Sequence, residues 1–181
     1  MDSGTVSAAL GVLVLFAARM AFRGLAAGEI RRRVEAMRER VHMVFVVDTL
    51  EYLARGGRIG KARALVGQML GIKPILTVAD GEVAALDRVR GGRMAHPRLI
   101  ELLKKMVDPE KGVVISVAHA QAPVWADRLK NLLQQNFQVK ELIECEIGPT
   151  VGTHVGPGTV GAVVFQPQPE EEHLIAPLAK A

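Results

Sequence analysis

The chain has 181 residues, 49% of them hydrophobic, so it is long enough to bury a core and to form one or two globular domains. A single cysteine excludes an internal disulfide, and the cysteines and histidines show no spacing typical of a metal site. The formal charge of +4 is mild and aromatic residues make up only 4%, which argues against an aromatic platform for single-stranded nucleic acid.

The first predicted element is an apolar helix. Residues 8–22 are almost entirely apolar but include Arg19, and the segment is shorter than the ~20 residues needed to span a bilayer. We therefore expect a buried helix in a soluble, cytoplasmic protein, without stable membrane insertion. Ser3 or Thr5 is placed to cap this helix, and Gly24 is placed to end it.

Helical and extended patterns alternate along the rest of the chain. Residues 41–47 form a largely apolar run rich in β-branched residues, which is typical of a buried strand, and Asp80-Gly81 between two apolar runs predicts a hairpin. Because a hairpin interrupts strict strand–helix–strand order, the sequence predicts an α/β fold with a mixed sheet and flanking helices. The other predicted elements are helices at 28–40, 50–54, 61–70, 97–107 and 123–137 and strands at 73–78, 83–89, 113–118, 140–147 and 162–165. A polar, proline-bearing segment from residue 167 to residue 181 predicts a mobile tail.

The richest candidate for function is the stretch from Gly148 to Gly161. It holds five glycines, two prolines and one histidine, His154. Glycine permits positive φ and close approach to a ligand, and an imidazole is suited to bind a small anion or to carry a proton. A tight turn before a closing strand, with His154 incidental, explains the same residues equally well.

Two further glycine-rich turns carry cations. The first holds Arg55, Arg58 and Lys61, and the second lies between Arg90 and Arg93. Arginine beside a glycine turn favours a carboxylate or phosphate ligand, although neither turn has the spacing of a Walker loop or a dinucleotide fingerprint. No Gly-x-Ser-x-Gly elbow is present, so binding is favoured over hydrolysis.

Several motifs together resemble the DegV family of bacterial fatty-acid-binding proteins. The matching motifs are FVVDTLEYL at 45–53 with RGGRI at 55–59, IKPIL at 72–76 with DG at 80–81, VRG at 89–91, and IGP..GTH.GPG at 147–158. The likeness covers nearly all of residues 2–165, in the family's order and spacing. The resemblance implies two α/β lobes that hold a long-chain fatty acid in an apolar tunnel between them. It also implies no catalytic residue, metal or cofactor in this chain.

The resemblance also implies roles for individual residues. His154 would bind the fatty-acid carboxylate, with Arg58, Thr153 and Gly152 beside the head group. Arg90 and Arg93 would face a separate fatty-acid kinase subunit, which phosphorylates the carboxylate to an acyl-phosphate for phospholipid metabolism. Members usually carry a further basic residue after Arg-Gly, where this chain has Arg90-Gly91-Gly92.

The family's opening region, with a Thr-Ser loop that donates hydroxyls to the carboxylate, has no counterpart in this sequence. We therefore expect an incomplete first lobe, with residues 1–47 as its remnant, 48–166 as the second α/β lobe with the head-group loop, and 167–181 as the tail. We also expect weak fatty-acid binding by this chain alone. Two alternatives stay open from the residues: a phosphate-handling enzyme that uses the Arg/Gly turns, and a basic nucleic-acid-binding domain built on residues 31–33, Arg38 and Arg40.

Overall fold

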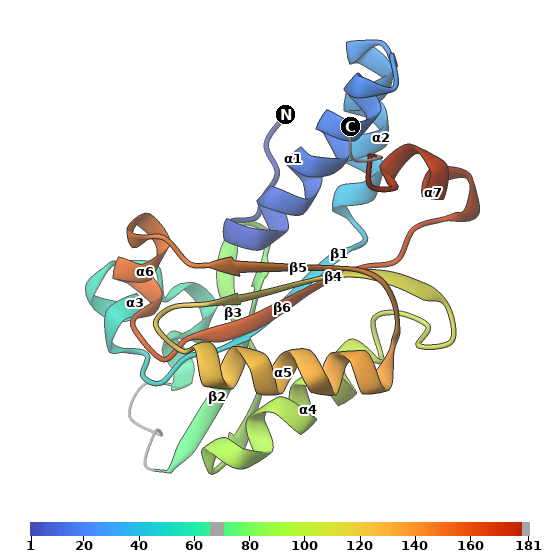
Figure 1. The fold of residues 1–181 in the computed structure, drawn as a ribbon. Helices are drawn as coiled ribbons and strands as arrows, with labels where there is room; N and C mark the ends of the chain where they lie inside the picture. The colour runs from blue at the N-terminus through green and yellow to red at the C-terminus, as the bar shows by residue number, and fades with distance from the viewer. Residues whose placement is uncertain (66–70, 179–181) are drawn as a thin grey trace.

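A computed structural model describes residues 1–65 and 71–178, and within them six strands form one mixed sheet (Figure 1). The strand order is β3-β2-β1-β6-β4-β5. Strands β4 and β5 pair in parallel, and the other neighbours pair antiparallel. The prediction of an α/β fold with a mixed sheet is confirmed. The strands are β1 Val41–Val46, β2 Ile72–Ala79, β3 Glu82–Arg90, β4 Gly112–His119, β5 Gln138–Glu146 and β6 Val160–Phe165.

Helices cover both faces of the sheet and one of its ends. The α-helices are α1 Ser7–Phe22, α2 Ala27–Arg38, α3 Glu51–Arg55, α4 Ala95–Leu103, α5 Pro123–Asn136, α6 Pro149–Val155 and α7 Pro169–Ile175, with 3-10 helices η1 Gly60–Leu65 and η2 Gly92–Met94. Helices α4 and α5 pack on one face, while α1, α2 and α7 share a core with the other (Figure 1). Helices α3 and α6 lie side by side where β1 ends, above a third apolar cluster.

The hairpin prediction is confirmed. Strands β2 and β3 are joined by Asp80 and Gly81, which have φ values of 54° and 77°. Positive φ at both central residues is characteristic of a type I′ turn, in which Asp-Gly is a preferred pair. The twist of this turn matches the twist of the two strands that it joins.

One prediction about a helix start is wrong, and one predicted helix differs in type over its described residues. Helix α1 begins at Ser7 after Val6, with no side-chain cap, because the Ser3 hydroxyl instead donates to the Thr5 carbonyl. The segment 61–70 begins as 3-10 helix η1, and its residues 66–70 lie outside the described part of the chain. Gly24 does end the first helical segment, with φ of 83°.

Within the segment expected to be a mobile tail, Pro169–Ile175 form helix α7. Gln168 and Glu171 form a capping box at its first turn, and Arg40 pairs with Glu171 from the start of β1. Leu174 and Ile175 are buried in the core with α1. The composition of this segment did not predict the helix because it has only two buried apolar side chains, and its buried Glu171 is stabilised by the distant Arg40.

The sheet continues across the boundary expected between residues 47 and 48. Strand β1 lies in the middle of the order, between β2 and β6, both of which belong to the expected second lobe. No described helix is long and apolar enough to cross a membrane.

Candidate functional site

The glycine-rich stretch at residues 148–161 is half helix and not an open loop. Pro149 occupies the first turn of α6, where its missing N–H costs nothing, and Gly156 with φ of 77° ends the helix. His154 therefore projects from a short helix that is fixed at both ends. The expectation of a head-group loop is corrected to a helix followed by a turn.

His154 packs directly against helix α3. A β-carbon placed on Gly56 would overlap Nδ1 of His154 and would lie 3.0 Å from its Cε1. The Nδ1 atom is buried and has no hydrogen-bond partner among the described residues, although the side chain as a whole is only half-buried. One edge of the imidazole is thus held by α3, and the other edge remains available.

The contact between α3 and α6 is reciprocal. The Tyr52 ring of α3 packs on Gly156 at the end of α6, at a distance that leaves no room for a side chain there. Helix α3 supplies the Tyr52 ring and ends at Gly56, and helix α6 supplies the His154 ring and ends at Gly156. This arrangement locks the two short helices together at the carboxyl end of β1.

Arg58 reaches the same place from the turn that follows α3. Its Nη1 donates to the Gly56 carbonyl at 3.2 Å, and the side chain is otherwise exposed. Gly56 therefore contacts both residues: its carbonyl accepts from Arg58, and its α-carbon packs against His154. A shared role for Arg58 and His154 at the head group stays a prediction from the family resemblance.

A carboxylate and an amine flank the next turn. Asp48, directly after β1, packs on Gly158 so closely that no side chain fits at residue 158. Lys73 donates to Asp48 Oδ1 at 2.6 Å and to the Asp48 carbonyl at 3.2 Å. This pair neutralises the Asp48 carboxylate, which would otherwise repel a second carboxylate bound nearby.

An apolar cavity of about 70 Å³ lies beneath α6, between the sheet and the start of α1. Strands β1, β4 and β6 contribute one face of the sheet, and α6 contributes Val151 and Val155. The sheet residues that line the cavity are Met43, Phe45, Ala118, Gly161, Ala162 and Val163. Burial of acyl methylenes is the interaction that such a lining favours.

Two larger open pockets adjoin this cavity and share lining residues with it. One, of about 460 Å³, contains Arg58 and Gly57 and shares Val6, Val78 and Val83 with the cavity. The other, also of about 460 Å³, lies between α1 and β5 and shares Val151 with the cavity. The described residues therefore outline an apolar path that opens into a charged pocket, where Arg58 lies with Asp2 and Glu82.

The structure separates the four predicted carboxylate ligands into two pairs. The Thr153 hydroxyl donates to the Pro149 carbonyl at 2.7 Å, and the Gly152 N–H donates to the Gly148 carbonyl at 2.8 Å. Both donors are thus used inside α6. His154 and Arg58 are the two that keep donor groups outside the hydrogen bonds of the described residues.

The other predicted cations stand on a separate surface. Arg90 ends β3, and Arg93 lies in η2 beside the exposed Met94. Both arginines are exposed, and no ion pair to either is formed by residues 1–65 and 71–178. Their surface is therefore positively charged and partly apolar.

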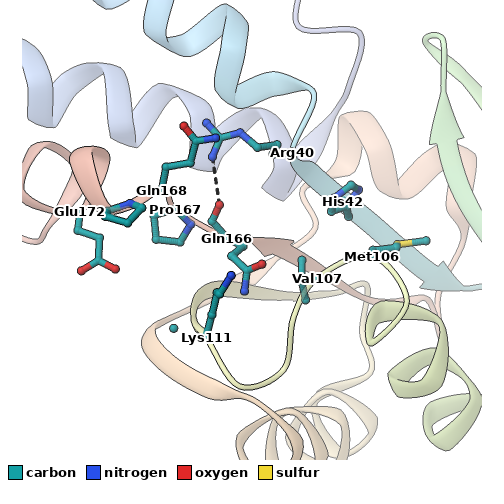
Figure 2. Close-up of a pocket in the computed structure, with 11 residues that line it drawn as sticks. Arg40, His42, Met106, Val107, Lys111, Gln166, Pro167, Gln168 and Glu172 are labelled. Carbon is teal, nitrogen blue, oxygen red and sulfur yellow. Dashed lines mark hydrogen bonds between the residues drawn. The ribbon is translucent and has the colours of Figure 1, made fainter.

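A pocket of about 420 Å³ at the opposite end of β1 does not extend this site (Figure 2). There Arg40 donates to the Gln166 carbonyl at 3.2 Å and pairs with Glu171, while Glu172 pairs with Lys140. Burial lowers the pKa of His42 beside it. The salt bridges of Arg40 and Glu172 therefore neutralise both of these side chains within the protein.

The remaining histidines have structural surroundings. His119 Nδ1 accepts from the Ala122 N–H at 3.3 Å and so closes the turn before α5. His96 is buried edge-on against Trp125, and burial, assisted by the charge of Arg128, lowers its pKa to about 4.

The two alternatives from the sequence find little support in these contacts. Of the basic cluster, Arg31 and Arg33 pair with glutamates four residues away, and Arg38 and Arg40 also bind carboxylates. A phosphate-handling enzyme requires a carboxylate or hydroxyl directed at His154, and no such hydrogen bond occurs among the described residues. Nor do those residues gather three metal-ligating side chains.

Sequence reasoning missed the residues that position His154. Gly56 and Tyr52 lie inside a recognised motif, but nothing in their spacing indicates that they meet α6. The cavity lining was missed for a related reason. Alternation places Met43 and Phe45 on one strand face, yet only the packed structure distinguishes a cavity wall from filled core.

Comparison with known proteins gives a consistent result. A family model named DegV, described as "Uncharacterised protein, DegV family", matches residues 1–167. The chain is 35% identical over 166 residues to a DegV domain-containing protein of Clostridium acetobutylicum, covering 91% of this chain and 59% of that protein. It is 39% identical over 162 residues to another from Clostridium perfringens, covering 89% and 56%. The chain therefore spans less than two thirds of the length of these relatives.

Solved structures show the same similarity. A DegV family protein from Thermus thermophilus, described by its fatty-acid binding, superposes with a TM-score of 0.87 at 29% identity, covering 92% of this chain and 60% of that one. DegV from Bacillus subtilis, described as a fatty acid binding protein, gives 0.79 at 29% identity, with coverage of 92% and 60%.

Proposed function

The chain belongs to the DegV family, and we propose that it binds a long-chain fatty acid, with the acyl chain in the apolar cavity and the carboxylate at His154 and Arg58. The observation that carries this proposal is the continuity of the apolar cavity with a pocket lined by Arg58, which follows the helix whose Gly56 contacts His154. Similar proteins described as fatty-acid-binding support the same ligand class.

The energetics divide between the two parts of the ligand. Each buried methylene contributes about 0.8 kcal/mol, so a long acyl chain supplies most of the affinity. A hydrogen bond to a charged carboxylate contributes about 1.5–3 kcal/mol, which is enough to orient the ligand. The shape of the cavity then selects the acyl chain, and the donor groups of His154 and Arg58 select the head group.

The size of the cavity limits what this chain binds alone. Its volume of about 70 Å³ is well below the ~300 Å³ at the lower end of small-molecule pockets. Much of an acyl chain therefore lies in the open pockets of this chain, where fewer of its methylenes leave water. We propose that the 181-residue chain binds fatty acid weakly.

The direct test is a calorimetric titration of the purified chain with a saturated long-chain fatty acid below its critical micelle concentration. We expect saturable binding with one site and a negative heat-capacity change from apolar burial. A fatty alcohol of the same length is the matched ligand, and it should bind more weakly because it lacks the carboxylate. Absence of saturable binding of the acid, or equal affinity for the two ligands, would contradict the proposal.

We further propose that Arg90 and Arg93 contact a separate kinase subunit that phosphorylates the presented carboxylate. Both side chains are exposed on one surface with Met94, and a positive, partly apolar surface favours an acidic partner. In this scheme the chain itself has no catalytic residue.

Reversal of both charges should weaken the complex with that kinase subunit. For Arg90→Glu with Arg93→Glu we expect at least about a tenfold increase in the Kd for the kinase subunit, because close charge pairs at interfaces contribute more than ~1.4 kcal/mol. Fatty-acid affinity should not change. Arg32→Glu, at an exposed arginine of α2, changes the net charge as much as either single variant and is their control. Equal effects of Arg90→Glu, Arg93→Glu and this control would contradict a specific contact.

A further inference from the structure

Residue 56 is glycine for reasons of space and not of backbone conformation. Its φ of −76° and ψ of −1° are ordinary helical values that any residue adopts, whereas the next glycine, Gly57, has φ of 66°. What a side chain at residue 56 would meet is the imidazole of His154, and secondarily the Tyr52 carbonyl at 3.1 Å. The ring and the bare α-carbon thus fit together as a pair.

The contact places one nitrogen of the ring in a defined environment. Nδ1 of His154 faces the α-carbon of Gly56, is closed off from solvent, and has no acceptor or donor partner among the described residues. A neutral imidazole carries one N–H and one lone pair on its two nitrogens. The surroundings of Nδ1 therefore decide which nitrogen holds the proton.

The two tautomers differ in how well they fit this contact. A proton on Nδ1 would be a buried donor without an acceptor and would press against the hydrogens of the Gly56 α-carbon. A lone pair on Nδ1 instead faces a weakly polarised Cα–H group, a contact of the same kind as the weak hydrogen bonds that Cα–H groups make to oxygen. The second arrangement is favoured.

We propose that Gly56 is a positioning residue that holds His154 in the tautomer with a bare Nδ1, so that Nε2–H is the donor presented to the ligand. This inference rests on the proposed function for the identity of the ligand, a carboxylate oxygen that accepts from Nε2. The tautomer itself is a property of the ligand-free chain. The Tyr52 ring, which packs on Gly156, also holds α6 in place against α3.

Nitrogen-15 NMR of the ligand-free chain tests the tautomer independently of lipid binding. At a pH where His154 is neutral, we expect its Nδ1 resonance in the range of an unprotonated ring nitrogen and its Nε2 resonance in the range of an N–H. The reverse assignment, or rapid averaging of the two, would overturn the inference even if the chain binds fatty acid. The expected assignment without any fatty-acid binding would uphold the positioning of His154 and refute the proposed function instead.

A double-mutant cycle tests whether Gly56 acts through His154. In Gly56→Ala the methyl group displaces the ring, and we expect a loss of fatty-acid affinity of about tenfold or more, the size of one hydrogen bond to a charged group. In the His154→Ala background the space is already empty, so the same substitution should change affinity by less than about twofold. Gly28→Ala in α2, where a methyl group meets nothing closer than Arg32 at 4.0 Å, is the matched control.

Equal losses from Gly56→Ala in the two backgrounds would overturn the inference, because the effect would then not pass through the histidine. Unchanged affinity in Gly56→Ala would overturn it as well. Should Gly56→Ala fail to fold, the nitrogen-15 assignment of the unmodified chain decides the question.

Discussion

Ala118→Leu is expected to weaken fatty-acid binding by about 100-fold while the chain stays folded. Ala118 is buried on β4 and lines the apolar cavity of about 70 Å³. The three added carbons occupy this space, and displacement of about four methylenes at ~0.8 kcal/mol each removes about 3 kcal/mol of binding free energy. Partial filling of the cavity offsets part of the overpacking cost of about 1–3 kcal/mol, so folding should survive.

A direct binding titration, with thermal unfolding as the check on folding, measures this effect. Ala85→Leu adds the same carbons at an exposed position of β3 and should leave the affinity for the acid unchanged. Loss of affinity in both variants would indicate a general effect of added apolar surface. Unchanged affinity in Ala118→Leu would show that the acyl chain does not enter this cavity.

His154→Ala is expected to weaken binding of the acid by about 10- to 100-fold and to leave binding of the matched fatty alcohol nearly unchanged. The imidazole supplies one hydrogen bond to a charged carboxylate, which contributes about 1.5–3 kcal/mol. It adds nothing specific for an alcohol. The ratio of the two affinities therefore isolates the head-group contact from the burial of the acyl chain.

His173→Ala serves as the control for this substitution. His173 is exposed on α7, away from α3 and α6, and its removal should affect neither ligand. Equal weakening of the acid and the alcohol in His154→Ala would mean that the residue supports the structure of α6 and does not bind the carboxylate.

Local patterns predicted the sheet and most of the helices, because periodicity and turn chemistry act over a few residues. Asp80-Gly81 determines the hairpin by its backbone preference alone. The β-branched run at residues 41–47 gave β1 almost to the residue. The same reasoning failed for α7, since that helix is stabilised by the distant Arg40–Glu171 pair and by burial against α1.

The candidate site was predictable only in part. Glycine content pointed to residues 148–161, but the stretch forms a helix because Pro149 and Gly156 define its two ends. That His154 meets Gly56 depends on the tertiary packing of α3 on α6, which no pattern in either segment encodes. The cavity likewise depends on tertiary packing, because the side chains of α1, α6 and the sheet leave a space between these elements.

The position of the bound acyl chain is the most direct test of this account. The measurement is the set of nuclear Overhauser contacts between fatty-acid methylenes and protein methyl groups in the complex. We predict contacts to the methyl groups of Ala118, Val151 and Val155, which line the cavity. An open apolar groove of about 590 Å³ between α1 and α2, which includes Leu10 and Val14, offers a competing place for a nonspecific lipid. Contacts confined to that groove would contradict the account.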